Sequence, residues 1–462
     1  MKRLFLNEIR ECIGGHGIGE PDGSAAAAGV SIDSRNVAEG DIFFAIRGER
    51  FDGHQFVAAA FECGAAGAVV ERLPDDVPAD RRNRVLRVDD TVRALGRLAA
   101  CYRKGLSGTV IAVTGSNGKT TTRDMIHHVL SKHLAGKRSI KSYNNHIGVP
   151  LTLLDAEPGE DFLVVEAGSN HPGEIDYLGG IIRPDIAVIT QVAETHLEGF
   201  GTIEHVAAEK ASLAKHVTAG GAVVVNGDRE MLLRLIEPPS RAVVVKFGQS
   251  EHNDLRLTGV KAGFDEARFS VNDRFAFRLP APGRHNAFNA VAAIAVARRM
   301  GLEMDQIATA LEDFRLPSMR LEVLRLPDLT VVNDAYNANP TSMASALETL
   351  GSLDGSGRVV FFCGDMRELG PGSERFHREL GQRIAAGRVN VLVTVGSETR
   401  ATADEAMRSG LRSDQVSHFA NSSEAAEAAD RIVREGDTVL LKGSRSIGLE
   451  AVAERLKRLR QG

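Results

Sequence analysis

The sequence predicts an α/β protein of three domains: a small α/β N-terminal domain, a central domain with a mostly parallel sheet, and a C-terminal doubly wound, Rossmann-like domain. Two observations support this prediction. Short apolar runs alternate with helical stretches along most of the 462 residues, which is the pattern of parallel sheets with crossover helices. A glycine-rich turn at residues 114–120 joins one such run to a helix, and this order of elements builds a phosphate-binding loop.

Length and composition indicate a globular protein of two to four domains. A chain of 462 residues is too long for one hydrophobic core. Its 43% hydrophobic and 25% charged residues are typical of globular proteins, and its net charge of −5 argues against nucleic acid or an anionic membrane as a partner. No stretch approaches the roughly 20 apolar residues of a membrane span, and the N-terminus lacks the apolar core of a signal peptide.

The four cysteines point to the same class of protein. Cys12, Cys63, Cys101 and Cys363 are scattered along the chain and form no CxxC pair. This usage is typical of reduced thiols, which persist in a reducing compartment. We therefore expect a soluble protein of the cytoplasm with all four thiols reduced.

Residues 1–107 are the first predicted domain, a small α/β unit. Strands are expected at 42–46 and 68–70, with a helix at 56–63 between them. The loops here are dense in polar groups. Four of these side chains either line a site for an anionic ligand or are simply solvated loop groups: Ser34, Arg35, Arg47 and His54.

The central domain, residues 108–315, begins with the strand, turn and helix of a P-loop. Residues 110–113 are an apolar run typical of a buried parallel strand, and the apolar residues of 119–130 recur at helical spacing. The turn's backbone N–H groups and the helix N-terminus would hold phosphate oxygens. Lys119 would lie on the β- and γ-phosphates, and the hydroxyl of Thr120 on Mg²⁺. The turn residues expected at the nucleotide are Gly115, Ser116, Asn117, Gly118, Lys119, Thr120 and Thr121.

This turn departs from the usual P-loop in one position. Val113 stands where the motif places its first glycine. The alternative interpretation is therefore an ordinary turn before a surface helix. The flanking strand and helix favour a nucleotide site, because the phosphate-binding mechanism requires both.

The rest of the central domain continues the strand–helix alternation, which predicts parallel strands with crossover helices. Four further strands are expected within 161–169, 186–192, 221–228 and 241–248. Residues 254–280 alternate apolar and polar side chains, which predicts an antiparallel extension of the sheet. A long alanine-rich helix at 286–300 follows.

Residues 316–462 repeat this alternation and predict the doubly wound C-terminal domain. Its expected strands lie within 329–336, 358–366, 390–396, 416–420 and 437–444. Ligands of such sheets bind at the carboxyl ends of the strands, which points to Asp334, Asp365 and the segment 442–445. A break in the pattern at 314–321 predicts a hinge to the preceding domain.

Three residues beyond the turn are candidates for phosphate or metal chemistry. Glu166 ends an apolar strand, where a carboxylate is costly unless Mg²⁺ or a salt-bridge partner offsets its charge. His196 follows the next strand, although a lone histidine is more often only packed or solvated. Lys210 lies among alanines that offer its ammonium no obvious partner, and a lysine in such a place usually extends to the surface.

Five lines of the sequence resemble the Mur ligases, ATP-dependent enzymes that add amino acids to the peptide of bacterial cell-wall precursors. These lines are TGSNGKTTT, VVEAGSNHPGEI, THLEGFG, AAEKASL and GRHNAFNAVAA, and they occur in the family's order. Four shorter lines resemble the branch that adds D-alanyl-D-alanine to UDP-N-acetylmuramoyl-tripeptide: KSYNNHIGVPLTLL, NDAYNANPTSM, CGDMRELG and LKGSRS. The DNPR line of the tripeptide-forming branch does not occur.

The resemblance implies a division of labour among the domains. Residues 1–107 would bind the UDP substrate, residues 108–315 would bind ATP, and residues 316–462 would close over both. The substrate carboxylate would take the γ-phosphate of ATP to give an acyl phosphate, and the amine of D-Ala-D-Ala would displace phosphate. Catalysis of this kind rests on positioning and charge neutralisation, which suits Lys119 together with two Mg²⁺ ions.

The resemblance also implies roles for single residues. Lys210 is expected to be carbamylated by CO₂, which turns a cation into an anion able to bind the second Mg²⁺ with His196 and Glu166. Lys119, His196 and Lys210 would thus be catalytic, and Thr120 would complete the metal ligands. Further ATP contacts are expected from Asn286 and Asn289 near the adenine, Arg320 at the γ-phosphate and Asp334 at the ribose. The UDP-substrate contacts expected are Ser34, Arg35, Asn144 and Asn145.

Two other functions stay open on the sequence. One is a different amide ligase with the same ATPase plan, either another Mur ligase or a folylpolyglutamate synthetase. The 107 residues before the P-loop argue against the latter, because the resemblance places the ATPase domain of that enzyme first. The other is a non-catalytic nucleotide-dependent switch or scaffold, against which the joint presence of Lys119, Glu166, His196 and Lys210 argues. We expect a monomer.

Overall fold

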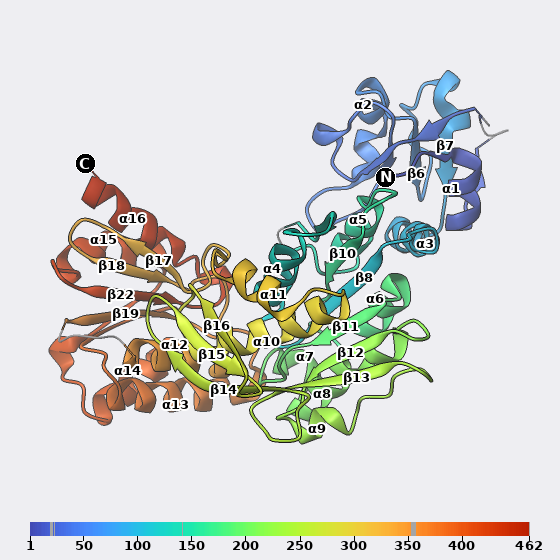
Figure 1. The fold of residues 1–462 in the computed structure, drawn as a ribbon. Helices are drawn as coiled ribbons and strands as arrows, with labels where there is room; N and C mark the ends of the chain where they lie inside the picture. The colour runs from blue at the N-terminus through green and yellow to red at the C-terminus, as the bar shows by residue number, and fades with distance from the viewer. Residues whose placement is uncertain (19–21, 23, 141, 353–356, 462) are drawn as a thin grey trace.

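The computed structural model describes residues 1–18, 22, 24–140, 142–352 and 357–461. Three sheets of five or more strands follow one another along this part of the chain, and Figure 1 shows them as three bodies, with the N-terminal one at the upper right and the C-terminal one at the left. The three-part α/β fold is as predicted. Lys141, which opens one of the sequence lines quoted above, lies outside the described residues. No helix within those residues combines the length and hydropathy needed to cross a bilayer.

The first sheet has five strands in the order β2-β7-β6-β5-β4, and its neighbours are parallel except for β2 and β7. Its strands are β2 (His16–Gly17), β4 (Gly29–Ser31), β5 (Asp41–Phe44), β6 (Gly67–Val70) and β7 (Val85–Arg87). The two expected strands are thus present as β5 and β6. The helices are α1 (Leu6–Ile13), α2 (Val57–Glu62) and α3 (Thr91–Arg103). A separate antiparallel pair joins β1 (Leu4–Phe5) to β3 (Ala26–Ala27).

The expectation of four reduced thiols is wrong for two of the cysteines. Cys12 in α1 and Cys101 in α3 form a disulfide, with their Cα atoms 5.8 Å apart. The two residues are 89 positions apart in sequence, and only the packing of α1 against α3 brings them together. Cys63 and Cys363 are free thiols. Cysteine spacing therefore gave no sign of the bond.

The central sheet has nine strands in the order β16-β15-β14-β13-β12-β11-β8-β10-β9. The strands are β8 (Thr109–Thr114), β9 (Gly136–Arg138), β10 (Phe162–Glu166), β11 (Ile186–Ile189), β12 (Ala222–Asn226), β13 (Val243–Gly248), β14 (Leu255–Ala262), β15 (Ala267–Val271) and β16 (Phe275–Leu279). Pairing is parallel from β9 to β14 and antiparallel among β14, β15 and β16, as the alternation at 254–280 predicted.

Helices cover both faces of the central sheet (Figure 1). They are α4 (Lys119–Leu130), α5 (Gly148–Leu154), α6 (Glu174–Ile182), α7 (Leu197–Phe200), α8 (Ile203–Ala211), α9 (Glu230–Leu233), α10 (Arg284–Arg299) and α11 (Met304–Leu311). The strand β8 feeds a core on each side: Val110 and Ala112 pack with α3, α5 and α6, whereas Ile111 and Val113 pack with α4 and α10. Because β8 is buried on both faces, packing on each side of the sheet fixes the position of its last residue, where the phosphate loop begins.

The third sheet has six strands in the order β17-β18-β22-β19-β20-β21. Its strands are β17 (Glu322–Arg325), β18 (Thr330–Asn333), β19 (Val359–Gly364), β20 (Val391–Val395), β21 (Val416–Phe419) and β22 (Thr438–Lys442). All neighbours are parallel except the edge strand β17, which runs antiparallel to β18. The helices are α12 (Pro340–Gly351), α13 (Ser373–Ala386), α14 (Thr399–Arg408), α15 (Ser422–Ile432) and α16 (Glu450–Gln461).

The predicted hinge segment at 314–321 connects α11 to β17 without regular structure. Within it, Met319 and Leu321 have φ of 58° and 52°, in the left-handed region that side chains other than glycine disfavour. The two residues on either side of Arg320 thus have a disfavoured backbone conformation, just before the chain enters the C-terminal sheet. Hinge motion at this segment stays a prediction.

Candidate active site

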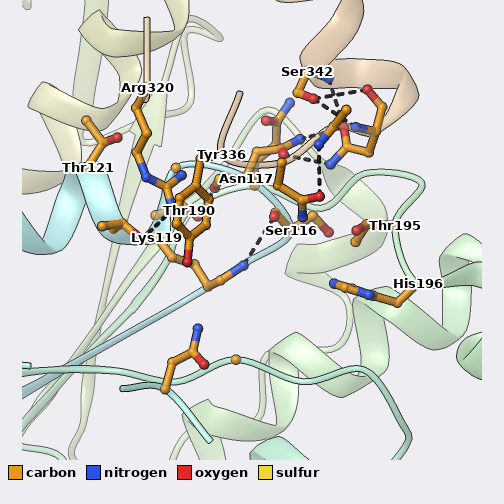
Figure 2. Close-up of a pocket in the computed structure, with 18 of the residues that line it drawn as sticks. Ser116, Asn117, Lys119, Thr121, Thr190, Thr195, His196, Arg320, Tyr336 and Ser342 are labelled. Carbon is orange, nitrogen blue, oxygen red and sulfur yellow. Dashed lines mark hydrogen bonds between the residues drawn. The ribbon is translucent and has the colours of Figure 1, made fainter. Parts of the chain in front are cut away.

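A cavity of about 1370 Å³ lies where the carboxyl ends of the central strands face the C-terminal sheet. Both domains supply its walls, as the close-up in Figure 2 shows for the phosphate loop and the residues opposite it. Fourteen of the residues predicted from sequence line it: Ser116, Asn117, Gly118, Lys119, Thr120, Thr121, Asn144, Asn145, Glu166, His196, Asn286, Asn289, Arg320 and Asp334. Of the residues to which the resemblance gave a role, Gly115, Lys210, Ser34 and Arg35 do not line it, and neither do the further candidates Arg47, His54 and Asp365. Asp365 is buried beneath the strand ends, where its carboxylate accepts from the backbone N–H groups of Glu398 and Thr399.

The phosphate loop between β8 and α4 requires glycine at two positions. Gly115 has φ of 142°, and a Cβ there would lie 2.1 Å from Oγ1 of Thr190. Gly118 has φ of 83°, and a Cβ there would lie 2.3 Å from Oδ1 of Asn289. The loop is thus clamped between the end of β11 and the helix α10. In this arrangement the start of α4 points toward the cavity, where a phosphate would meet its N-terminus.

Lys119 is the first residue of α4 and is half-buried in the loop. Its ammonium donates to the carbonyl oxygens of Gly115 at 2.7 Å and Ser116 at 3.2 Å. Burial lowers the pKa of Lys119 to about 8; the carboxylate of Glu166 opposes this shift, and the charge of Arg320 adds to it. The ammonium is thus held at the loop carbonyls, where the charges of a carboxylate and of a second cation both act on it, and an added phosphate would offset its desolvation.

Glu166 ends β10 and is almost fully buried. One carboxylate oxygen accepts from Arg123 at 3.1 Å, and the other accepts from the side-chain amide of Asn144 at 2.9 Å. For this carboxylate the sequence left open either Mg²⁺ or a salt-bridge partner, and Arg123 is such a partner. Sequence reasoning missed Arg123, although its position four residues after Lys119 on α4 places both on one face of the helix.

His196 precedes α7 with φ of 51°, so its backbone is in the left-handed region. Its Nδ1 is hydrogen-bonded to the carboxylate of Glu368, which follows β19 in the C-terminal domain. This hydrogen bond is also the main cause that lowers the pKa of Glu368. Sequence reasoning missed Glu368. Two signals were available: its place three residues after Asp365, which the strand-end rule had singled out, and its place within the line CGDMRELG.

Lys210 does not extend to the surface, and its ammonium does have a partner. Only 1% of the residue is exposed, and Nζ donates to the hydroxyl of Ser169 at 2.6 Å. The ammonium also lies 5.6 Å from the ring centroid of Phe200. Burial, followed by the charge of Lys119, lowers the pKa of Lys210 to about 7. Ser169 lines the cavity, so Lys210 lies directly behind its wall.

The two sides of the predicted nucleotide site are held by polar networks. Asn289 donates to Asn286 at 3.1 Å, and Asn286 in turn donates to the carbonyl of Pro282 at 2.8 Å. On the opposite side, Asp334 after β18 accepts from Lys442 at the end of β22 at 2.5 Å. The adjacent carboxyl ends of β18 and β22 thus present an ion pair to the cavity, as the strand-end rule predicted for this sheet.

The residues predicted for the UDP end of the substrate lie elsewhere. Ser34 and Arg35 are on a short 3-10 turn of the N-terminal domain, and Arg35 forms an exposed salt bridge with Asp33 at 2.7 Å. His54 is buried and bonded to Asp52 at 2.7 Å and to the backbone N–H of Glu71 at 2.9 Å. The alternative of a solvated loop group is therefore wrong for His54, which is only 1% exposed and has both ring nitrogens bonded within its own domain.

The cavity offers oxygen donors that suit Mg²⁺. Within the described residues, no three or more His, Cys, Asp or Glu side chains are grouped closely enough to hold a metal alone. The hydroxyl of Thr120 and the carboxylate of Glu166 both line the cavity. Mg²⁺ is commonly bound by one or two carboxylates plus phosphate oxygens and water. This donor set fits an ion whose remaining ligands come from a bound nucleotide.

Comparison with known proteins gives a consistent result. Three family models match successive parts of the chain: "Mur ligase family, catalytic domain" at residues 27–103, "Mur ligase middle domain" at 113–297, and "Mur ligase, glutamate ligase domain" at 319–445. The UDP-N-acetylmuramoyl-tripeptide–D-alanyl-D-alanine ligase of Bacillus subtilis is 36% identical over 430 residues, which cover 93% of each chain.

Solved structures extend this likeness to the whole fold. MurF from Acinetobacter baumannii matches with a TM-score of 0.89 and 30% identity over 99% of each chain. The MurF ligase from Thermotoga maritima, solved in complex with ADP, matches with a TM-score of 0.81 and 29% identity, covering 94% of this chain and 98% of that one. The similarity therefore includes all three sheets.

Proposed function

The chain belongs to the Mur ligase family, and from this we infer that it joins D-alanyl-D-alanine to UDP-N-acetylmuramoyl-tripeptide with the use of ATP. The product is the UDP-N-acetylmuramoyl-pentapeptide precursor of bacterial peptidoglycan. One observation carries this proposal: a single cavity gathers a phosphate loop with its lysine, a strand-end carboxylate, and an arginine from the opposite domain. These are the groups needed to position a transferring phosphoryl group and neutralise its charge.

The reaction we propose has two steps. The terminal carboxylate of the tripeptide attacks the γ-phosphorus, an O–P bond forms, and the bond to the β,γ-bridging oxygen breaks to release ADP. The amine of D-Ala-D-Ala then attacks the acyl carbon of the acyl phosphate. A C–N bond forms, the nitrogen loses a proton, and inorganic phosphate departs. Phosphorylation is needed because a free carboxylate is a poor electrophile, whereas phosphate is a good leaving group.

The chain's own residues would act mainly by position and charge. Lys119 and the loop N–H groups neutralise negative charge on the transferring phosphoryl, and Arg320 does so from the other side. Thr120 and Glu166 would hold Mg²⁺, which when bound neutralises charge on the phosphate oxygens. Asn286, Asn289 and Asp334 would hold the adenosine part. Support for these roles comes from their common place on one cavity.

Lys210 would enter the site as a carbamate. Its neutral amine would attack CO₂, forming an N–C bond and releasing a proton, and the resulting anion with Glu166 and His196 would hold a second Mg²⁺. Two observations support this proposal: the ammonium is buried directly behind the cavity wall, and its pKa is lowered to about 7. A neutral amine is therefore available near neutral pH, as carbamate formation requires.

We also propose that the domains end where the sequence patterns place them, at 1–107, 108–315 and 316–462. The UDP end of the substrate would then lie on the first domain near Ser34 and Arg35. Its peptide end would reach the cavity at Asn144 and Asn145, both of which line it.

The test of this function is phosphate release from ATP by the purified protein. Release should require UDP-MurNAc-tripeptide and D-Ala-D-Ala together, with separate assays for lysine and diaminopimelate at the third position of the tripeptide. A parallel assay with a folate and glutamate tests the alternative ligase. Phosphate release that ignores the UDP substrate, or that follows the folate, would contradict the proposed function.

A further inference from the structure

Tyr336 lies in the loop between β18 and α12 and contacts residues of both domains that form the cavity (Figure 2). The Cζ atom of Arg320 lies 4.0 Å from the centroid of its ring. Its hydroxyl is hydrogen-bonded to the hydroxyl of Ser142, in the central domain. Its backbone N–H donates to the carbonyl of Met319 at 3.2 Å. Tyr336 therefore connects the hinge segment to the far wall of the cavity.

The hinge segment needs such support because its backbone is constrained. Met319 and Leu321, on either side of Arg320, both have positive φ, a conformation that persists only when the surroundings enforce it. The N–H of Leu321 donates to Asp334 at 3.1 Å, and Tyr336 holds the carbonyl of Met319. The β18–α12 loop thus fixes both neighbours of Arg320.

The fixed backbone delivers the Arg320 guanidinium to the phosphate loop. Its Nη2 donates to the hydroxyl of Thr120 at 2.9 Å, across the boundary between the domains. Figure 2 shows the guanidinium between the ring of Tyr336 and the loop that carries Lys119. A stacked arginine of this kind keeps its planar donors pointing in one direction.

Ser142 connects Tyr336 to the other substrate. It stands two residues before Asn144, whose amide donates to Glu166 at 2.9 Å. Asn145 accepts from the backbone N–H of Gly148 at 2.9 Å and so starts α5. The segment 142–145 is the part of the cavity wall to which we assign the peptide end of the UDP substrate. A ligand that contacts this segment would therefore also affect Ser142, the partner of the Tyr336 hydroxyl.

We propose that Tyr336 is a positioning residue that couples the UDP-substrate segment 142–145 to the grip of Arg320 on the nucleotide phosphates. The proposal rests on the proposed function for the identity of the two ligands. Its ring would hold Arg320 in place through the stacking contact. Its hydroxyl would transmit a change at Ser142 through their hydrogen bond. Because coupling between two sites is reciprocal, the UDP substrate should tighten nucleotide binding through this residue.

The first test removes only the hydroxyl. In Tyr336→Phe, a non-hydrolysable ATP analogue with Mg²⁺ should bind alone within about twofold of the parent, because the stacked ring is kept. The tightening produced by UDP-MurNAc-tripeptide should be lost. Calorimetric titration of the analogue with and without the tripeptide measures both quantities. If the tripeptide still tightens binding to the parental extent, the link through Ser142 is wrong.

The second test removes the ring as well. In Tyr336→Leu, the analogue alone should bind about two- to fivefold more weakly than in the parent, which is the size of an exposed cation–π contact. This measurement needs no UDP substrate. Equal affinity of Tyr336→Leu and Tyr336→Phe for the analogue would show that the ring does not hold Arg320 and would overturn that part of the proposal.

A second residue and a matched control separate coupling from general damage. Ser142→Ala should reproduce the loss of coupling in Tyr336→Phe, and the double variant should lose nothing further, since both changes break one contact. Ser413→Ala, at an exposed side chain of the C-terminal domain that does not line the cavity, should leave both affinities unchanged. Additive losses in the double variant would overturn the proposal. A parent protein that shows no turnover of the tripeptide would contradict the proposed function instead, while the analogue titration of Tyr336→Leu would still report on the ring.

Discussion

The carboxylate of Glu368 is hydrogen-bonded to Nδ1 of His196, although 172 residues separate them and they lie in different domains. This bond fixes the tautomer in which Nδ1 carries the proton, so that Nε2 is the nitrogen free to act as a ligand. The C-terminal domain thus supplies the group that orients an imidazole of the central domain. The site is complete only when the two domains are together.

If His196 binds a metal as proposed, Glu368→Ala should lower turnover about 10- to 100-fold, the usual cost of losing the carboxylate that orients such a histidine. Mn²⁺ binding in the presence of nucleotide, followed by electron paramagnetic resonance, should weaken in parallel. Glu368→Gln should keep much of both, because its amide oxygen still accepts from Nδ1–H. The control is Glu374→Ala, whose carboxylate is exposed and paired with Arg378. Unchanged Mn²⁺ binding in Glu368→Ala would refute the orienting role.

Removal of the phosphate-loop cation should abolish most of the catalysis. We expect Lys119→Ala to lower turnover by roughly 10²-fold or more, which is the effect of losing one preorganised donor at a developing charge. Thermal unfolding should change little, because the ammonium's hydrogen bonds are to two loop carbonyls, and its removal relieves the cost of burying a charge. Steady-state phosphate release together with a melting curve checks both. Near-normal turnover in a folded variant would refute the assignment of the phosphate loop to ATP.

The activity lost on removal of the Lys210 amine should be partly restored by a small carboxylate. Lys210→Ala should be nearly inactive while folded, and acetate or propionate at high concentration should restore part of the rate by filling the anionic position. Lys210→Arg should not respond, because its side chain keeps positive charge in that space. Phosphate release in CO₂-depleted buffer, with and without the carboxylate, is the measurement. Normal activity of Lys210→Ala in that buffer would exclude a carbamate.

The lowered pKa of Lys210 also predicts how stability depends on pH. Lysine has a pKa of 10.5 in the unfolded chain and about 7 here, so between these values the unfolded state binds more protons. The free energy of unfolding contributed by this group therefore rises with pH across that window. Lys210→Met should be more stable than the parent near pH 7, and its advantage should shrink toward alkaline pH.

Urea unfolding of the parent and of Lys210→Met, in Mg²⁺-free and CO₂-depleted buffer, measures that difference. It should be followed from about pH 6 to about pH 9, where the carboxylates keep one charge state. A pH-independent difference between the two proteins would mean that Lys210 keeps an ordinary pKa in the fold.

Closure of the C-terminal domain should follow ligand binding. Asn117 of the phosphate loop and Asn339 at the start of α12 exchange side-chain hydrogen bonds of 2.7 and 3.3 Å across the boundary, so the structure has the domains in contact. ATP analogue and UDP substrate together should draw the solution ensemble toward this arrangement. Small-angle scattering should then give a smaller radius of gyration. An unchanged radius at saturating ligand would count against closure.

Local signals predicted the phosphate loop well, because its strand, turn and helix are consecutive and each has its own pattern. They failed where two distant segments meet. Nothing near Lys210 in sequence reveals that α8 docks with this side chain inward against Ser169, 41 residues away. The same holds for Glu368, whose partner belongs to another domain. The salt bridge of Arg123 was within reach, since it lies one helical turn after Lys119.

The two glycines of the phosphate loop have a consequence for inhibitors of this enzyme. Resistance to a drug commonly arises when the target exchanges a residue at the contact for a bulkier one. Here a Cβ at Gly115 or Gly118 would collide with Thr190 or Asn289, so a bulkier residue at either position would disturb the loop itself. For a compound that bound only the backbone amides of this loop, few substitutions at the contact residues would therefore give resistance and still leave the loop intact.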